Sequence, residues 1–268
     1  MDRALERPFE TLQIATLEGG ILQVLLDRPT AANAMNTQMG RDLLALFGRL
    51  AAEPDAARCV VLSATGDRAF CAGGDLKERN GMTDAQWQAQ HLIFERMIRA
   101  IIDCPLPVIA AVNGAAYGGG LEIALGCDFI YASRGARFAL TEVTLGIMPG
   151  AGGTQNLPRA VGARRAKELI LTGAAFSAEE ALAFGLVNRV CEPGKLLSEA
   201  IETARRIARN GPLSVRQAKH AIHHGMEMSL ANGMLFEIEA YNRLVPTEDR
   251  REGILAFNEK RSAQFKGR

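Results

Sequence analysis

The segment PVIAAVNGAAYGGGLEIAL, residues 107–125, decides the fold. Its first part, 107–112, is a short apolar run typical of a buried strand, and 113–120 is a glycine-rich turn. The part that follows, 121–125, predicts the start of a short buried helix. A strand that passes through such a turn into a helix favours βαβ units and a layered sheet.

The same alternation continues along most of the chain. Apolar patterning predicts a hairpin of strands at 12–17 and 21–26, helices at 37–53 and 83–103, and further strands at 58–64, 128–133 and 137–140. After about residue 154 the pattern is mostly helical, at 163–171, 177–184, 195–209, 212–224, 229–244 and 248–260. We therefore predict an α/β protein with a core over residues 1–190 and a C-terminal helical region over 191–268.

Composition and charge argue against several classes of protein. The 268 residues carry 31 basic and 30 acidic side chains, and this balance gives no support for a generic nucleic-acid or membrane-surface protein. No apolar run reaches the ~18 residues of a membrane span, and residues 1–10 lack the apolar stretch of a signal peptide. Five scattered cysteines without a CxxC pair indicate neither a disulfide framework nor a zinc ribbon, so we expect a reduced, cytoplasmic setting.

Two glycine-rich loops and two glutamates are the candidate functional groups. The loops are AFCAGGDLKE, residues 69–78, and the turn at 113–120, and each opens near a predicted helix. Small residues let a ligand approach backbone N–H groups, so the two loops could supply two donors to one developing oxyanion. Glu122 and Glu142 could divide acid and base roles there. Plain turns, a helix-terminal Glu122 and a surface Glu142 explain the same pattern without any function.

Taken together, these residues resemble the enoyl-CoA hydratase/isomerase (crotonase) family. The likeness runs from about residue 13 to residue 267 and includes DRPTAANAM at 27–35, GIMPGAGGTQ at 146–155, AKELILTG at 166–173 and EGILAFNEKR at 252–261. The resemblance implies a spiral core of stacked ββα turns and a C-terminal helical region used for trimerisation. It also implies a homo-oligomer, a trimer or a dimer of trimers, that binds acyl-CoA thioesters.

The resemblance assigns roles to four residues. The family stabilises a thioester enolate with two backbone N–H groups, which by motif position belong to Gly74 and Gly119. Many members carry Ala at the first position, but Gly74 still offers the N–H. Hydratases of the family use two glutamates, which implies that Glu122 deprotonates the attacking water and that Glu142 protonates the α-carbon. The favoured function is an enoyl-CoA hydratase that needs no metal or redox cofactor, because coenzyme A is part of the substrate.

Substrate contacts are implied for backbone groups near the start of the chain, for both loops and for the tail: Ala32, Ala34, Ala72, Asp75, Leu76, Lys77, Tyr117, Phe257 and Lys260. The backbone around the first three would accept the adenine and pantetheine parts, and Lys77 matches a basic position near the phosphates. Phe257 and Lys260 match tail residues that reach coenzyme A from a neighbouring subunit. Thr30 stands where a lysine is often found, so one phosphate contact is expected to be missing. The acyl pocket is expected to be lined by residues 82–87, Tyr117, Leu140, Ile147 and Met148.

Two other functions remain open at this point. Another reaction of the family, such as enoyl-CoA isomerisation, fits the same motifs. The segments at 225–228 and 246–250 are similar to methylglutaconyl-CoA hydratases that also bind AU-rich RNA through a lysine-rich early helix. The corresponding helix here, at 37–53, has only Arg41 and Arg49 as basic residues, so we expect no nucleic-acid binding.

Overall fold

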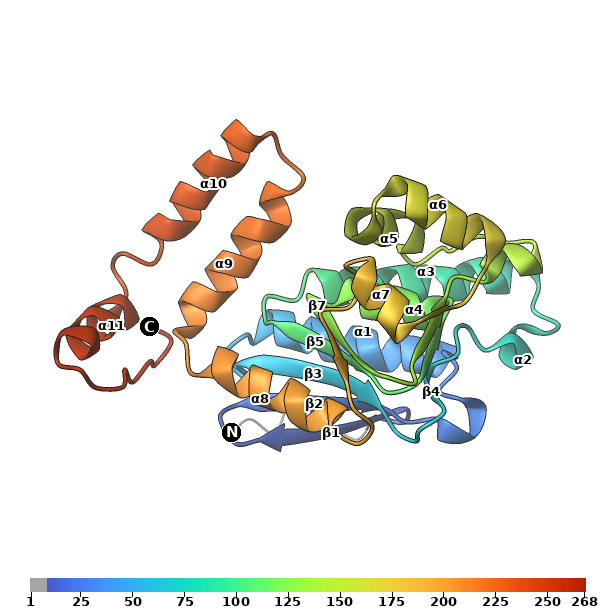
Figure 1. The fold of residues 1–268 in the computed structure, drawn as a ribbon, viewed down its shortest axis with the longest axis horizontal. Helices are drawn as coiled ribbons and strands as arrows, with labels where there is room; N and C mark the ends of the chain where they lie inside the picture. The colour runs from blue at the N-terminus through green and yellow to red at the C-terminus, as the bar shows by residue number, and fades with distance from the viewer. Residues whose placement is uncertain (1–8) are drawn as a thin grey trace.

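The structure is a computed structural model that describes residues 9–268. Residues 1–8 lie outside the described residues. They include the start of the predicted core and most of the segment 1–10, in which we expect no signal peptide. Within the described range the predicted α/β class is confirmed, because helices pack against two sheets (Figure 1).

The larger sheet contains six of the strands described in residues 9–268, in the order β1-β2-β3-β5-β7-β10. Their bounds are β1 Leu12–Leu17, β2 Ile21–Leu26, β3 Cys59–Ala64, β5 Val108–Val112, β7 Phe129–Ser133 and β10 Arg189–Cys191. β1 and β2 form the predicted antiparallel hairpin. The other neighbouring strands are parallel, because helices carry the chain back between them.

A second sheet of short strands carries the glycine-rich loops. Its order is β4-β6-β8-β9, with β4 at Ala69–Cys71, β6 at Ala115–Tyr117, β8 at Arg137–Ala139 and β9 at Phe176–Ser177. The pairs β3 and β4, β5 and β6, and β7 and β8 are consecutive in the chain but belong to different sheets. A helical segment follows each pair, so successive ββα units stack side by side and place β4, β6 and β8 in parallel.

Helices cover both faces of the larger sheet. On one face, α1 (Thr37–Ala52) and α3 (Asp84–Ile102) contribute Phe47 and Phe94 to a large buried cluster. On the other face, α8 (Leu196–Ala208) packs through Ala200 and Ala204. Burial on both faces explains why β3 and β5 are apolar along their whole length instead of alternating.

The last helices extend away from this core (Figure 1). α9 (Pro212–Gly225) and α10 (Leu230–Asn242) pack as a hairpin, and α11 (Glu248–Asn258) follows them. Their apolar stripes are open in the single chain, where Leu230 is 81% and Phe257 is 83% exposed. The division of the chain at residue 190 stays a prediction, and α8, which lies beyond it, packs on the larger sheet.

The remaining elements are short. They are α2 (Leu76–Arg79), α4 (Gly119–Gly126), α5 (Gly153–Val161), α6 (Ala163–Thr172), α7 (Ala178–Ala183) and the 3-10 turns η2 (Pro29–Ala31) and η3 (Glu142–Leu145). β4 and β6 were predicted as parts of loops, because three residues are too few for an apolar pattern. Across residues 9–268, none of the helices combines the length and the apolar character needed to cross a membrane.

Candidate active site

Two neighbouring strands of the smaller sheet bring the glycine-rich loops to one place. β4 and β6 are parallel, so both strands end at the same edge of the sheet. Gly74 follows β4, whereas Gly118 and Gly119 follow β6 and lead into α4. Gly118 has a φ of +51°, a conformation that favours glycine. A Cβ built on Gly119 would lie 3.9 Å from the Gly74 amide nitrogen, so the two loops meet.

The Gly74 and Gly119 amides are available to a ligand. Among the described residues, neither amide donates a hydrogen bond to another protein group. Gly119 opens α4, where the first N–H groups have no partner within the helix and carry partial positive charge. Both glycines line a cavity of about 180 Å³. Two unpaired donors that meet at a cavity are the arrangement that an oxyanion requires, and this role of the two amides stays a prediction.

The first glycine loop is fixed by contacts with residues early in the chain. The Met35 amide donates to the Gly73 carbonyl over 2.7 Å, and the Asp75 amide donates to the Met35 carbonyl over 2.9 Å. Arg28 forms a 3.0 Å ion pair with Asp75 and also donates to the Ala34 carbonyl. The loop is therefore held from both sides, which limits its freedom to move.

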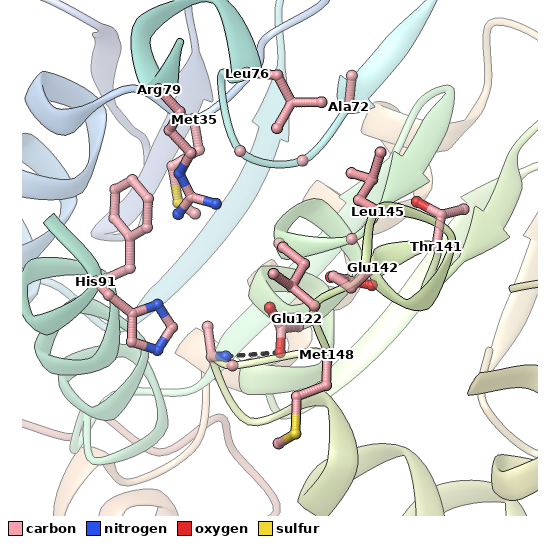
Figure 2. Close-up of a pocket in the computed structure, with 18 of the residues that line it drawn as sticks. Met35, Ala72, Leu76, Arg79, His91, Glu122, Thr141, Glu142, Leu145 and Met148 are labelled. Atoms are coloured by element: carbon pink, nitrogen blue, oxygen red, sulfur yellow. Dashed lines mark hydrogen bonds between the residues drawn. The ribbon is translucent and has the colours of Figure 1, made fainter. Parts of the chain in front are cut away.

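Glu122 is buried in the first turn of α4, with 3% of its surface exposed. Its Oε1 accepts hydrogen bonds from the Ala151 and Gly153 amides, both over 2.8 Å, and Figure 2 shows its carboxyl group in the cavity. Burial raises the pKa of Glu122 to about 7, although these two hydrogen bonds act in the opposite direction. The group can therefore hold or release a proton near neutral pH.

Glu142 lies in the 3-10 turn η3 and lines the same cavity, where Figure 2 shows it close to Glu122. A Cβ built on Gly118 would lie 3.0 Å from Glu142 Oε1, so the carboxyl group stands beside the turn that begins α4. Its Oε2 is buried and has no hydrogen-bond partner among the residues described. Burial raises the pKa of Glu142 and favours its protonated form.

The cavity brings together the four residues assigned to the reaction and two of the predicted substrate contacts: Gly74, Gly119, Glu122, Glu142, Ala72 and Leu76. The other predicted contacts in the core lie outside its lining: Ala32, Ala34, Asp75, Lys77 and Tyr117. The Ala72 amide does donate to the Ala32 carbonyl over 3.1 Å, so these segments adjoin. Phe257 lies in α11 and Lys260 just beyond it, and Figure 1 shows α11 at the opposite end of the molecule from α2. Their role in substrate binding stays a prediction.

The acyl-pocket residues expected from the sequence divide in the same way. Trp87, Ile147 and Met148 line the cavity, whereas residues 82–86, Tyr117 and Leu140 lie outside its lining. Sequence reasoning missed three polar lining residues, Arg79, His91 and Thr141. His91 belongs to the predicted helix at 83–103, and no motif surrounds Arg79. The only signal for Arg79 is its place one turn after Asp75, which caps α2.

The raised pKa of Glu122 predicts a pH-dependent stability. Because the pKa is higher in the fold than the ordinary 4.5, the fold binds the proton more tightly than the unfolded chain. The contribution of Glu122 to stability is therefore fully present below pH 4.5 and is lost as the pH rises from there through about 7. Glu122→Gln keeps an oxygen acceptor for the Ala151 and Gly153 amides but cannot ionise.

We compare the free energy of unfolding of Glu122→Gln with that of the natural chain at pH 4.5 and at pH 8. The difference should shift by about 3 kcal/mol in favour of the variant between these pH values, because one pKa unit corresponds to ~1.4 kcal/mol. Urea unfolding at both pH values measures this difference. Glu53→Gln, at an exposed residue that ends α1, is the matched control. A gain no larger than that of the control would mean that the fold does not resist ionisation of Glu122.

Known proteins resemble this chain along nearly its whole length. The model of the family "Enoyl-CoA hydratase/isomerase" matches residues 16–268. YngF of Bacillus subtilis, which carries the name of the family, is 47% identical over 244 residues, or 91% of this chain and 94% of YngF. A short-chain-enoyl-CoA hydratase of Clostridium acetobutylicum is 40% identical over 252 residues, or 94% of this chain and 96% of that protein.

A solved structure extends the likeness to the fold. The enoyl-CoA hydratase of Bacillus anthracis matches with a TM-score of 0.94 at 42% identity, and the match covers 97% of this chain and 100% of that one. This confirms the crotonase-type core and C-terminal helical region that the sequence resemblance implied. Since the family model spans nearly the whole chain and the relatives match along nearly their whole length, the chain belongs to the enoyl-CoA hydratase/isomerase family of enzymes.

Proposed function

We propose that the chain is an enoyl-CoA hydratase, which reversibly adds water across the 2,3 double bond of a 2-enoyl-CoA thioester. The observation that carries this proposal is the pair of carboxyl groups, Glu122 and Glu142, in one cavity with two unpaired backbone amides. A double-bond shift needs one group that moves a proton, whereas hydration needs a base for water and an acid for carbon. Two carboxyl groups that can divide these tasks favour hydration.

In this proposal the thioester oxygen accepts hydrogen bonds from the Gly74 and Gly119 amides, which stabilise the enolate as it forms. One such donor supplies roughly 2.7–4 kcal/mol in other enzymes. Glu122, with a pKa of about 7, takes the proton of the water that attacks the β-carbon. Glu142, whose pKa burial raises, delivers a proton to the α-carbon from the same side. No metal or redox cofactor takes part, since the amides hold the developing charge.

We infer that the acyl chain is short. The cavity of about 180 Å³ lies below the ~300–1,000 Å³ of drug-sized pockets, and Trp87, Ile147 and Met148 form part of its wall. The Clostridium acetobutylicum relative, named for short-chain substrates, supports the same inference. Coenzyme A would then lie outside this cavity, along Ala32, Ala34 and Lys77.

We also propose that the chain works in a reduced, cytoplasmic setting. Its five free thiols support this proposal.

Hydration can be tested with 2-enoyl-CoA substrates of four to sixteen carbons, followed by the loss of the conjugated thioester absorbance. We expect rapid loss with four and six carbons and little with sixteen. The matching 3-enoyl-CoA substrates form the control series. Gain of the conjugated absorbance from 3-enoyl-CoA, without its loss from 2-enoyl-CoA, would identify an isomerase and contradict the proposal.

We also propose that further copies of the chain cover α9, α10 and α11. A groove between α9 and α10 is lined by Ile222, Met226, Leu230 and Met234, and these apolar residues are exposed in the single chain. We expect a trimer or hexamer, because so large an exposed apolar surface is unusual for a monomer. Light scattering measures the mass directly. A fully active monomer of 28.9 kDa would exclude this assembly and the proposed contribution of Phe257 and Lys260 to a neighbouring site.

A further inference from the structure

The cavity contains a cation that the hydration chemistry does not use. Arg79, the last residue of α2, lines the cavity, and Figure 2 shows its guanidinium pointing into the space that Glu122 and Glu142 also face. The guanidinium carbon lies 4.2 Å from the centre of the Trp87 ring and 5.5 Å from that of Phe94. A Cβ built on Gly74 would lie 3.3 Å from Arg79 Nη1, which places the charge beside the first glycine loop.

A buried hydrogen-bond network fixes this guanidinium from behind. Arg79 Nε donates to Gln90 Oε1 over 2.8 Å, and Gln90 is only 3% exposed. Gln90 Nε2 donates in turn to Thr37 Oγ1 over 2.8 Å and to Glu78 Oε2 over 2.7 Å. The Thr37 amide also donates to Glu78 Oε2 over 2.8 Å. The network therefore uses Nε and leaves the two terminal nitrogens of Arg79 for the cavity.

No carboxylate neutralises Arg79 at contact distance. In the described part of the chain, no Asp or Glu oxygen lies within ion-pair distance of the guanidinium. The nearest candidates are engaged elsewhere, since Glu78 accepts from Gln90 and Thr37 and Glu122 accepts from two backbone amides. Burial lowers the pKa of Arg79 more than the charges of Glu78 and Glu122 raise it, so the charged form is held at a cost. A purely apolar acyl chain would increase that cost by removing water.

We propose that the guanidinium of Arg79 binds a carboxylate on the acyl group, so that the preferred substrate is the CoA thioester of a short dicarboxylic 2-enoic acid. The hydration of such a substrate rests on the proposed function, whereas the binding of its carboxylate to Arg79 does not. A planar guanidinium with both terminal nitrogens free is suited to bidentate recognition of a carboxylate. It would also offset the repulsion that a third carboxyl group meets beside Glu122 and Glu142.

Binding of saturated acyl-CoAs tests the proposal without any chemical step. Calorimetry compares glutaryl-CoA, which ends in a carboxylate, with pentanoyl-CoA, which has the same number of carbons. We expect the natural chain to bind glutaryl-CoA at least about tenfold more tightly. In Arg79→Met the ratio of the two affinities should fall about 30-fold, or ~2 kcal/mol. Arg79→Lys keeps the charge but loses the two terminal nitrogens that bind a carboxylate together, so it should give an intermediate ratio. Arg96→Gln, on the exposed face of α3, should keep the natural ratio.

Several results would overturn the proposal. These are equal affinities in the natural chain, a preference that survives Arg79→Met, or an Arg79→Met variant that changes only the pH profile of hydration. The last result would mean that Arg79 acts on the charge of Glu122 instead. Pentanoyl-CoA binding by each variant verifies that the site is folded. If glutaryl-CoA is preferred but neither glutaconyl-CoA nor 2-pentenoyl-CoA is hydrated, carboxylate binding stands and the hydratase proposal alone fails.

Discussion

Glu122→Gln and Glu142→Gln should each lower kcat for the hydration of a short 2-enoyl-CoA at least about 100-fold. This is the lower end of the effect expected when a general acid or base is lost. Each substitution removes a proton-transferring group from the cavity that holds the Gly74 and Gly119 amides. The rate at which the conjugated thioester absorbance is lost, measured with saturating substrate, gives kcat for each variant.

The two variants are close in shape to the natural side chains, which makes the prediction specific to proton transfer. Glu122 uses only Oε1 to accept from the Ala151 and Gly153 amides, and the amide oxygen of Gln can accept both bonds. Glu142 Oε2 has no partner among the described residues, so its replacement by an amide nitrogen breaks no hydrogen bond. Binding of saturated acyl-CoA should therefore survive in both variants and serves as the control for folding.

The double variant distinguishes a concerted pair from two independent groups. If both carboxyl groups act on one water and one enolate, the decreases in kcat from the two substitutions should be far from additive. The double variant should then have a kcat close to that of the worse single variant. An isomerase that happens to retain both glutamates predicts a different result, in which one substitution leaves most of the double-bond shift intact. Near-natural hydration by Glu122→Gln, with crotonyl-CoA and with longer chains, would show the two-glutamate proposal to be wrong.

The sequence predicts the larger elements well because they have long apolar patterns. The hairpin β1–β2, the helices α1 and α3 and the helical C-terminal region all lie where periodicity places them. The short strands β4 and β6 lack such a pattern, and they acquire their pairing only because β3 and β5 position them. Local sequence therefore predicts the loops that carry the site but not the sheet that brings the loops together.

The candidate site shows the same limit at the level of single residues. Family resemblance points to Glu122, but the backbone amides that hold its buried carboxyl group belong to Ala151 and Gly153, about thirty residues away. Arg79 belongs to no motif, and its direction is set by Gln90, eleven residues further along the chain. Contacts of this kind arise from packing between elements, so local sequence patterns do not predict them.

Gly120→Ala should impair both the site and the fold, because α4 touches β4 at this residue. A Cβ on Gly120 would lie 2.0 Å from the carbonyl oxygen of Cys71, the last residue of β4, and the backbone must move to admit it. Gly120 directly follows Gly119, whereas Cys71 precedes Gly74 by three residues. Any shift that relieves the clash therefore moves one of the two amides away from the other.

We expect kcat for hydration to fall about 100-fold or more, since a misplacement of ~1 Å can cost that much. Urea unfolding should report a loss of about 1–3 kcal/mol or more from overpacking. Gly48→Ala is the matched control, because a Cβ there meets nothing within 4 Å and the residue is exposed in α1. It should raise stability by about 0.5–1 kcal/mol and leave hydration unchanged. If Gly120→Ala behaves like this control, the contact between α4 and β4 does not set the distance between the two amides, and the rigid oxyanion site proposed here is incorrect.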